Sequence, residues 1–136
     1  MLSMAVPLMI LLKSKMQNKN TVPVSNDSQT NDSSKQSFWN ERWEAKETGW
    51  DIGYPSPAIS EYFSKFSEKE IAVLIPGCGN AYEAEFLVNA GFKNITLVDI
   101  APKAVEILRN KFAGNSNVRI LCADFFTIRE KFDILI

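Results

Sequence analysis

The chain of 136 residues contains no histidine. Histidine is the side chain that most often acts as a general base, activates a serine or cysteine nucleophile, or binds a metal ion. Serine-histidine and cysteine-histidine sites are therefore excluded within these residues, and we expect no metal site. Any chemistry must need little proton transfer from these side chains or obtain that transfer elsewhere.

Net charge and cysteine are also scarce. The formal net charge is −1 and the pI lies near 5.5, which argues against nucleic acid or an acidic membrane as the main partner. The two cysteines show no disulfide pattern and fit a reducing compartment, so we expect a cytoplasmic protein. Cys78 is either a nucleophile near a helix N-terminus or, as we favour, a small turn residue. Cys122 is predicted to lie in the core.

Long apolar runs are missing as well. The apolar run at 1–12 is too short to span a bilayer, and its lysines follow it instead of preceding it as in a signal peptide. We expect a dispensable extension, with a membrane-inserting or export segment as the alternative, and no stable membrane association. Residues 17–37 are mostly polar and predict a disordered tether. The chain thus divides into 1–37, an apolar start plus tether, and 38–136, part of one domain.

The sequence does contain a strand, turn and helix unit at residues 71–81, IAVLIPGCGNA. The β-branched run up to Pro76 predicts a strand, Gly77 and Gly79 predict a tight turn, and residues 80–90 predict a helix. Glycine is needed where a turn is tight or where a ligand approaches bare backbone. The N–H groups at the start of the helix would face whatever lies above the turn.

Strands and helices alternate after this unit. A helix is predicted from Pro102, and the further predicted strands are 95–98, 118–122 and 132–136. This alternation predicts an α/β fold, a Rossmann-like parallel sheet with right-handed crossovers and about four strands present. Asp99 and Asp124 follow two of these strands. Together with the glycine turn they mark a ligand crevice at the carboxyl ends of the strands.

The spacing of Asp99 indicates an adenosine-containing ligand. Asp99 lies 20 residues after Gly79, and a carboxylate at the end of a second strand accepts hydrogen bonds from both hydroxyls of a ribose. A nicotinamide cofactor is less favoured, because bulky Tyr82 replaces the third glycine of the G-x-G-x-x-G motif. We therefore expect a ligand smaller than a dinucleotide.

Tryptophans are concentrated upstream of the first strand. Trp39 and Trp43 are four residues apart and share one face of a predicted short helix, and Trp50 follows in a segment bounded by glycines. From their spacing alone, these side chains either cover the core or form part of a site.

Several segments together carry a family resemblance. VLIPGCGNAYEAEFL, ITLVDIAPKAVEIL and CADFF resemble the cofactor-binding half of class I S-adenosylmethionine-dependent methyltransferases. The pattern W-x3-W followed by G-W-D-x-G-x-P-x-P is similar to the opening segment of the thiopurine S-methyltransferase family, in particular its halide/thiol methyltransferase branch. The resemblance covers residues 38–136 and implies the N-terminal part of a seven-stranded fold with an N-terminal helical lid.

The resemblance implies which residues bind S-adenosylmethionine. Trp39, Trp43 and Trp50 would border the cofactor and close over it, and a cation–π attraction of ~0.5–2 kcal/mol suits a sulfonium beside an indole. Gly77 and Gly79 would let the backbone approach the methionine part.

It also implies the contacts of the adenosine. Asp99 would accept from the ribose hydroxyls and Ile100 would lie against the adenine, while Asp124 would accept from the adenine amino group and Phe125 would pack beside the ring. The implied activity is methyl transfer to a small soft nucleophile, such as a thiol, a thiopurine-like compound, a halide or thiocyanate. Such acceptors need no histidine base.

Two departures from the family leave alternatives open. Ala101 stands where the family often has a serine that caps the next helix, a difference of ~1 kcal/mol. The family continues beyond residue 136, so the chain resembles a fragment or truncated product, for which no catalytic residue is named. If the reading frame stops at residue 136, the open fourth strand predicts poor solubility and negligible turnover; if it continues, the enzyme activity is expected of the full product. The alternatives are a non-catalytic cofactor-binding fragment and, less favoured, an NAD-dependent oxidoreductase.

Overall fold

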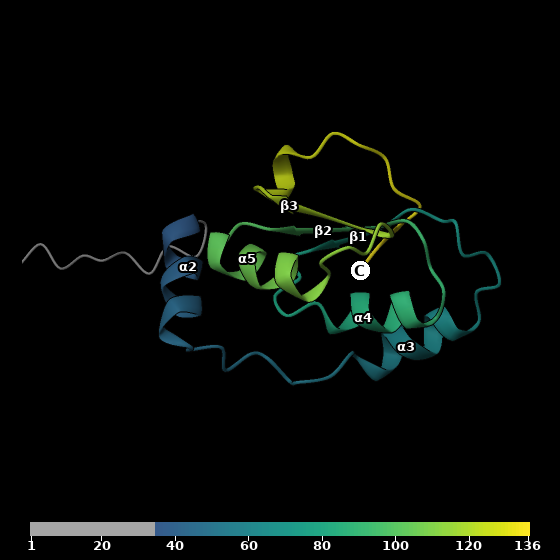
Figure 1. Cartoon of the computed structure of the whole chain (residues 1–136), viewed down its shortest axis with the longest axis horizontal. Helices are drawn as coiled ribbons and strands as arrows, with labels where there is room; N and C mark the ends of the chain where they lie inside the picture. Colours follow the sequence, from purple (N-terminus) through teal and green to yellow (C-terminus); the bar gives the residue numbers. More distant parts are fainter. Residues whose placement is uncertain (1–34) are drawn as a thin grey trace, which may run out of the picture. The chain divides into compact units, whose positions relative to one another are not determined.

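The computed structural model describes residues 35–136. The predicted apolar extension and most of the predicted tether lie in residues 1–34, outside the described residues. Two N-terminal helices precede an alternation of strands and helices (Figure 1). The elements are α2 (Gln36–Ala45), α3 (Pro57–Ser64), β1 (Val73–Pro76), α4 (Tyr82–Asn89), β2 (Ile95–Asp99), α5 (Pro102–Lys111), β3 (Val118–Cys122), the 3-10 helix η1 (Phe125–Thr127) and β4 (Ile134–Leu135).

The four strands form one parallel sheet in the order β3-β2-β1-β4. The register sets Pro76 opposite Val98 and Asp99 opposite Cys122, so the carboxyl ends of β1, β2 and β3 meet at one edge. β4 pairs with β1 through two residues, fewer than the predicted 132–136. The predicted α/β, Rossmann-like parallel sheet is confirmed.

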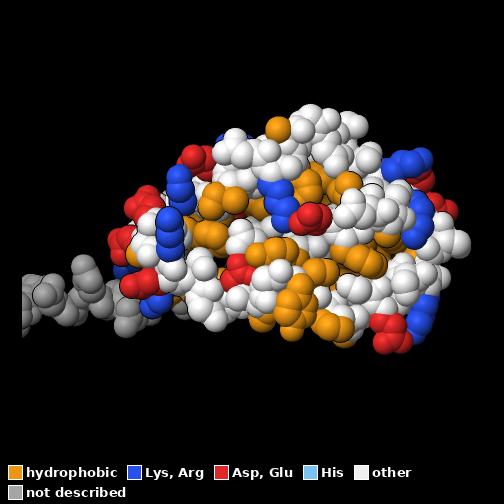
Figure 2. Space-filling view, turned by 60° about the horizontal axis from the view of Figure 1, so that its bottom comes forward, with side chains coloured by type: hydrophobic (Ala, Val, Ile, Leu, Met, Phe, Trp, Pro, Cys, Tyr) orange, Lys and Arg blue, Asp and Glu red, His pale blue; other side chains and the backbone are white. Residues whose placement is uncertain are grey.

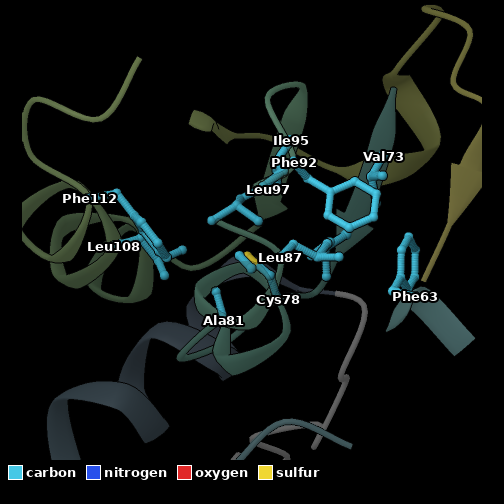
Figure 3. Close-up of a cluster of buried hydrophobic side chains, with 12 residues drawn as sticks. Phe63, Val73, Cys78, Ala81, Leu87, Phe92, Ile95, Leu97, Leu108 and Phe112 are labelled. Carbon is cyan, nitrogen blue, oxygen red and sulfur yellow. The ribbon is translucent and has the colours of Figure 1, made fainter. Parts of the chain in front are cut away.

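Helices α3, α4 and α5 lie on the same side of the sheet, and α2 stands against α5 (Figure 1). Between the helices and the strands lies a core that includes Leu87 of α4, Leu97 of β2 and Leu108 of α5, all fully buried (Figure 3). Phe63 of α3 meets Phe92 edge to face, with 5.4 Å between ring centroids. Each such side chain contributes about 1.5–3 kcal/mol by leaving water, so this core fixes β1 and β2 below the site.

Besides the length of β4, two local predictions are wrong. Helix α4 begins at Tyr82 instead of residue 80, because the turn continues through Ala81, which has a φ of 52° and donates its N–H to the carbonyl of Cys78 at 2.7 Å. Cys122 was predicted to lie in the core, but its thiol is exposed. Within the described residues β3 is an edge strand with one neighbour, so no second strand covers its last residue.

Large apolar side chains also reach the surface. Figure 2 shows hydrophobic side chains gathered on one face of the molecule, interrupted by a few charged ones. Among the described residues, the large hydrophobic ones that are exposed are Trp50, Ile52, Tyr54, Tyr62, Phe126 and Leu135. Among residues 35–136, no helix combines the length and the apolar character needed to cross a membrane.

Candidate functional site

A cavity of about 300 Å³ opens where β1 and β2 end. Seven of the nine residues singled out from the sequence line it, although they come from α2, the segment after it, the glycine turn and the end of β2. The lining residues are Trp39, Trp43, Trp50, Gly77, Gly79, Asp99 and Ile100. The structure therefore brings the predicted lid and the predicted crevice together.

Asp99 is the polar anchor of this cavity. It is 7% exposed, and its Oδ2 accepts from the Gly79 N–H at 3.1 Å while its Oδ1 accepts from the Ala101 N–H at 2.9 Å. These two bonds hold the carboxylate rigidly between the glycine turn and the start of α5. Each carboxylate oxygen can accept a second hydrogen bond, so Asp99 retains acceptor capacity for a ligand with paired hydroxyl donors.

The two glycines of the turn share a backbone conformation but differ in their surroundings. Both have left-handed backbones, with φ of 58° at Gly77 and 50° at Gly79, a conformation that costs other residues strain. A Cβ at Gly79 would lie 3.5 Å from Cζ2 of Trp43, an ordinary contact distance, so the backbone conformation and not lack of space favours glycine there. A Cβ at Gly77 would meet no atom within 4 Å, so the backbone there borders open space.

The three tryptophans form one connected cluster. Trp50 meets Trp39 at 5.4 Å and Trp43 at 6.5 Å between ring centroids, in both cases edge to face. Trp43 is buried and packs against Ala101 and Ala104 at the start of α5, whereas Trp50 is 45% exposed. Spacing alone left open whether these side chains cover the core or form a site. Trp43 packs on α5 and also lines the cavity, and the role of the tryptophans in a binding site stays a prediction.

Asp51 ties the segment after α2 to the start of α4. Its Oδ2 accepts from the side-chain amide of Asn80 and from the Tyr82 hydroxyl at 3.3 Å, and its Oδ1 accepts from the Gly53 N–H at 2.8 Å. Sequence reasoning missed Asp51. The available signal was an acid next to a site tryptophan and an amide directly after the glycine turn.

A second cavity of about 260 Å³ shares Trp43, Trp50, Gly77 and Gly79 with the first. Sequence reasoning did not find it, because its walls combine distant segments. The residues found only in its lining are Asp51, Ile52, Tyr54, Cys78, Asn80, Tyr82 and Glu83. The two cavities together give the site an aromatic side and an acidic side around one glycine turn.

Two of the singled-out residues do not line either cavity. Asp124 is exposed, and its Oδ1 accepts from the Phe126 N–H at 2.9 Å, which caps η1. Phe125 is half-buried in η1. Both follow β3, the strand that pairs with β2, so they lie at the same edge of the sheet as Asp99. Their roles as adenine contacts stay predictions.

Cys78 is suited to packing and not to nucleophilic attack. Its side chain is buried, and this burial, reinforced by the negative charge of Asp99, raises the pKa of its thiol to about 12. A thiol with this pKa stays protonated near neutral pH and is a weak nucleophile. The simpler of the two predictions for Cys78, a small turn residue, agrees with this environment.

Known proteins resemble the chain in sequence over this whole region. Residues 34–134 match the thiopurine S-methyltransferase (TPMT) family. Probable thiol methyltransferase 2 of Arabidopsis thaliana is 34% identical over 102 residues, covering 71% of this chain and 45% of the relative. Thiopurine S-methyltransferase of Teredinibacter turnerae is 24% identical over 109 residues, covering 71% of this chain and 51% of the relative. The chain therefore spans about half the length of these relatives.

Solved structures agree on the fold. A protein whose structure concerns the conversion of a disulfide bond into a thioacetal group in echinomycin biosynthesis has a TM-score of 0.55 and 26% identity, covering 65% of this chain and 39% of that one. Magnesium protoporphyrin IX methyltransferase of Synechocystis, solved with bound SAH, has the same TM-score at 13% identity, covering 74% and 56%. At that identity the second likeness shows the fold alone. From the sequence match across residues 34–134, the chain belongs to the thiopurine S-methyltransferase family.

Proposed function

We propose that the cavity at the ends of β1 and β2 binds S-adenosylmethionine. The observation that supports this most strongly is the buried carboxylate of Asp99 on a wall shared with three indoles. Asp99 offers acceptors to the two ribose hydroxyls, and Ile100 offers an apolar surface to the adenine. The indoles suit a permanent positive charge, since their faces attract cations. The bare backbone at Gly77 leaves room for the methionine part.

We extend the proposed site to Asp124 and Phe125. They follow β3, whose last residue lies opposite Asp99 in the register, which supports a place beside the adenine. The cap that Asp124 gives to η1 uses one lone pair of its Oδ1, so the carboxylate keeps acceptors for an amino group.

We further propose methyl transfer to a small soft nucleophile, namely a thiol, a thiopurine-like compound, a halide or thiocyanate. When bound, S-adenosylmethionine supplies an electrophilic methyl group that is transferred in line. The residues of this chain orient the cofactor and exclude water, an effect worth up to ~7–11 kcal/mol when both reactants are aligned. The lack of histidine and the names of the thiol and thiopurine methyltransferase relatives support this acceptor class.

We also propose a cytoplasmic location, which the two free cysteines support.

Titration calorimetry with S-adenosylmethionine, S-adenosylhomocysteine and NAD tests the ligand. We expect the two adenosyl sulfur compounds to bind and NAD to bind more weakly, because Tyr82 occupies the place of the third glycine and its ring lies under the Lys111 ammonium at 4.9 Å. Tighter binding of NAD would contradict the proposal. Absence of binding by all three compounds would favour a chain that lacks a complete cofactor site.

A further inference from the structure

The first turn of α5 is capped from a distant part of the chain. Ala101 occupies the N-cap position and has no side-chain oxygen for the free N–H groups that begin every helix. The Oδ1 of Asn40, which lies 63 residues away in α2, accepts from the Lys103 N–H at 2.9 Å. Asn40 thus supplies the bond that a serine in place of Ala101 would have made.

This cap attaches the tryptophan helix to the ribose side of the site. Asn40 follows Trp39 directly and precedes Trp43 by three residues, and α5 starts three residues after Asp99. The Nδ2 of Asn40 donates to Glu44 at 2.8 Å, which fixes the amide so that its oxygen faces Lys103. One side-chain amide therefore links the lid to the helix that follows the proposed ribose carboxylate.

Helix α2 depends on such attachments. It has ten residues, makes no side-chain hydrogen bond at its own N-cap, and contains one buried residue, Trp43. An isolated helix of this length is marginal in water, and most helix stability in proteins comes from tertiary contacts. The packing of Trp43 on Ala101 and Ala104 and the bond from Lys103 to Asn40 hold α2 at the same place on α5.

We propose that Asn40 is a positioning residue for cofactor binding, because it docks α2 on the start of α5 and so holds Trp39 and Trp43 over the cavity. This inference rests on the proposed function, since it concerns affinity for S-adenosylmethionine and its product. In this proposal the N-terminus of α5 has two roles: it follows the strand that ends at Asp99, and it holds α2 in place.

Calorimetry with S-adenosylhomocysteine on four variants tests the proposal. In Asn40→Ala the Kd should rise at least fivefold, whereas the exchange Asn40→Asp/Glu44→Gln, which keeps an acceptor for the Lys103 N–H and a hydrogen bond between positions 40 and 44, should stay within twofold of the unchanged chain. Ala101→Ser gives α5 a local cap, and because Ala101 is buried against Trp43, this variant serves as the reference for the double variant. In the Asn40→Ala/Ala101→Ser double variant we expect a higher melting temperature than in Asn40→Ala, while the Kd stays at least fivefold above that of Ala101→Ser.

Tryptophan fluorescence provides the readout that a merely stabilising role would not change. All three tryptophans of the chain belong to the lid, so the emission reports on it alone. The ligand-free Asn40→Ala variant, measured well below its melting temperature, should emit at longer wavelength than Asn40→Asp/Glu44→Gln. The proposal is overturned if Asn40→Ala binds with unchanged Kd, or if the added serine restores affinity together with stability. No binding by the unchanged chain would instead refute the proposed function.

Discussion

Asp99 has two roles: it stabilises the local structure of the site, and we propose that it binds a ribose. Its two carboxylate oxygens accept from Gly79 and Ala101, so the same side chain shapes the turn and faces the cavity. Charge-assisted hydrogen bonds to ligand hydroxyls are worth ~1.5–3 kcal/mol in total, which corresponds to about 10- to 150-fold in Kd.

We therefore predict that Asp99→Ala weakens binding of S-adenosylhomocysteine by about 10- to 150-fold. Calorimetry at a temperature where thermal melting shows the variant to be folded measures this loss. Asp99→Asn keeps the shape of the side chain and one acceptor oxygen, so its Kd should lie between the Kd of the unchanged chain and that of Asp99→Ala. Unchanged affinity in both variants would mean that the ribose contact is misplaced.

Substitution of Gly79 should lower the free energy of unfolding, and Gly49 provides a matched control. The Gly79 N–H donates to Asp99, and the φ of Gly79 is 50°, so an alanine there would suffer strain of roughly 1–2 kcal/mol. Gly49 has no left-handed φ, and a Cβ there would meet nothing within 4 Å. Urea unfolding should show a loss for Gly79→Ala and almost none for Gly49→Ala. Equal effects would refute the role of the turn.

The two cysteines should differ in their reaction with iodoacetamide. At pH 8 the exposed Cys122 should be alkylated, and Cys78 should not, because burial holds its pKa at about 12. Mass spectrometry of peptides distinguishes the two sites.

The raised pKa of Cys78 also predicts a pH dependence of stability. Because the pKa of this thiol is above the ordinary 9.0 in the folded chain, the contribution of Cys78 to the free energy of unfolding is complete below pH 9 and decreases as the pH rises toward 12. Alkylation of Cys78 in the folded chain would contradict this environment.

At the scale of elements, the lid, which consists of α2 and the segment from there to Ser56, is attached at three points. Asn40 holds α2 on α5, and Asp51 holds the following segment on the turn before α4 through Asn80 and Tyr82. The Ser56 N–H adds a bond to Glu83 at 3.0 Å. The attachment at Asp51 should matter for binding, because Trp50 is its direct neighbour.

We predict that Asp51→Ala raises the Kd of S-adenosylhomocysteine about five- to tenfold, since loss of a hydrogen bond costs on the order of 1 kcal/mol. Glu47→Ala is the matched control, because Glu47 lies in the same segment and makes only a loose ion pair of 3.9 Å with Arg42. Calorimetry compares the two variants. Equal affinities would show that the second attachment is dispensable for the lid.

Most element boundaries were predictable from the sequence because they depend on local patterns. The apolar run before Pro76, the helix start at Pro102 and the strand at 118–122 all appear as expected. The late start of α4 was not predictable, because alanine rarely adopts the left-handed backbone that Ala81 has here.

Properties that depend on tertiary neighbours were beyond sequence reasoning. The exposure of Cys122 follows from the edge position of β3, which local patterns do not encode. The cap from Asn40 and the role of Asp51 join residues far apart in the chain. Of the seven residues that line the first cavity, Gly77, Gly79 and Asp99 could be grouped in advance because parallel strands end at one edge. The three tryptophans and Ile100 were placed there by the family resemblance.

At the scale of the whole molecule, the described residues form a four-stranded parallel sheet that is open at both edges. Within them β4 has one neighbouring strand, and Leu135 is 55% exposed and Phe126 79% exposed. An open strand edge with apolar side chains favours association with other chains. The chain spans about half the length of its relatives, so ligand binding tests this region more directly than turnover.

The most direct test is a crystal structure of this chain with S-adenosylhomocysteine. We predict that both ribose hydroxyls donate to the Asp99 carboxylate, that the adenine lies against Ile100, and that the sulfur lies beneath Trp39, Trp43 and Trp50. A ligand bound elsewhere, or one whose ribose points away from Asp99, would contradict the central proposal.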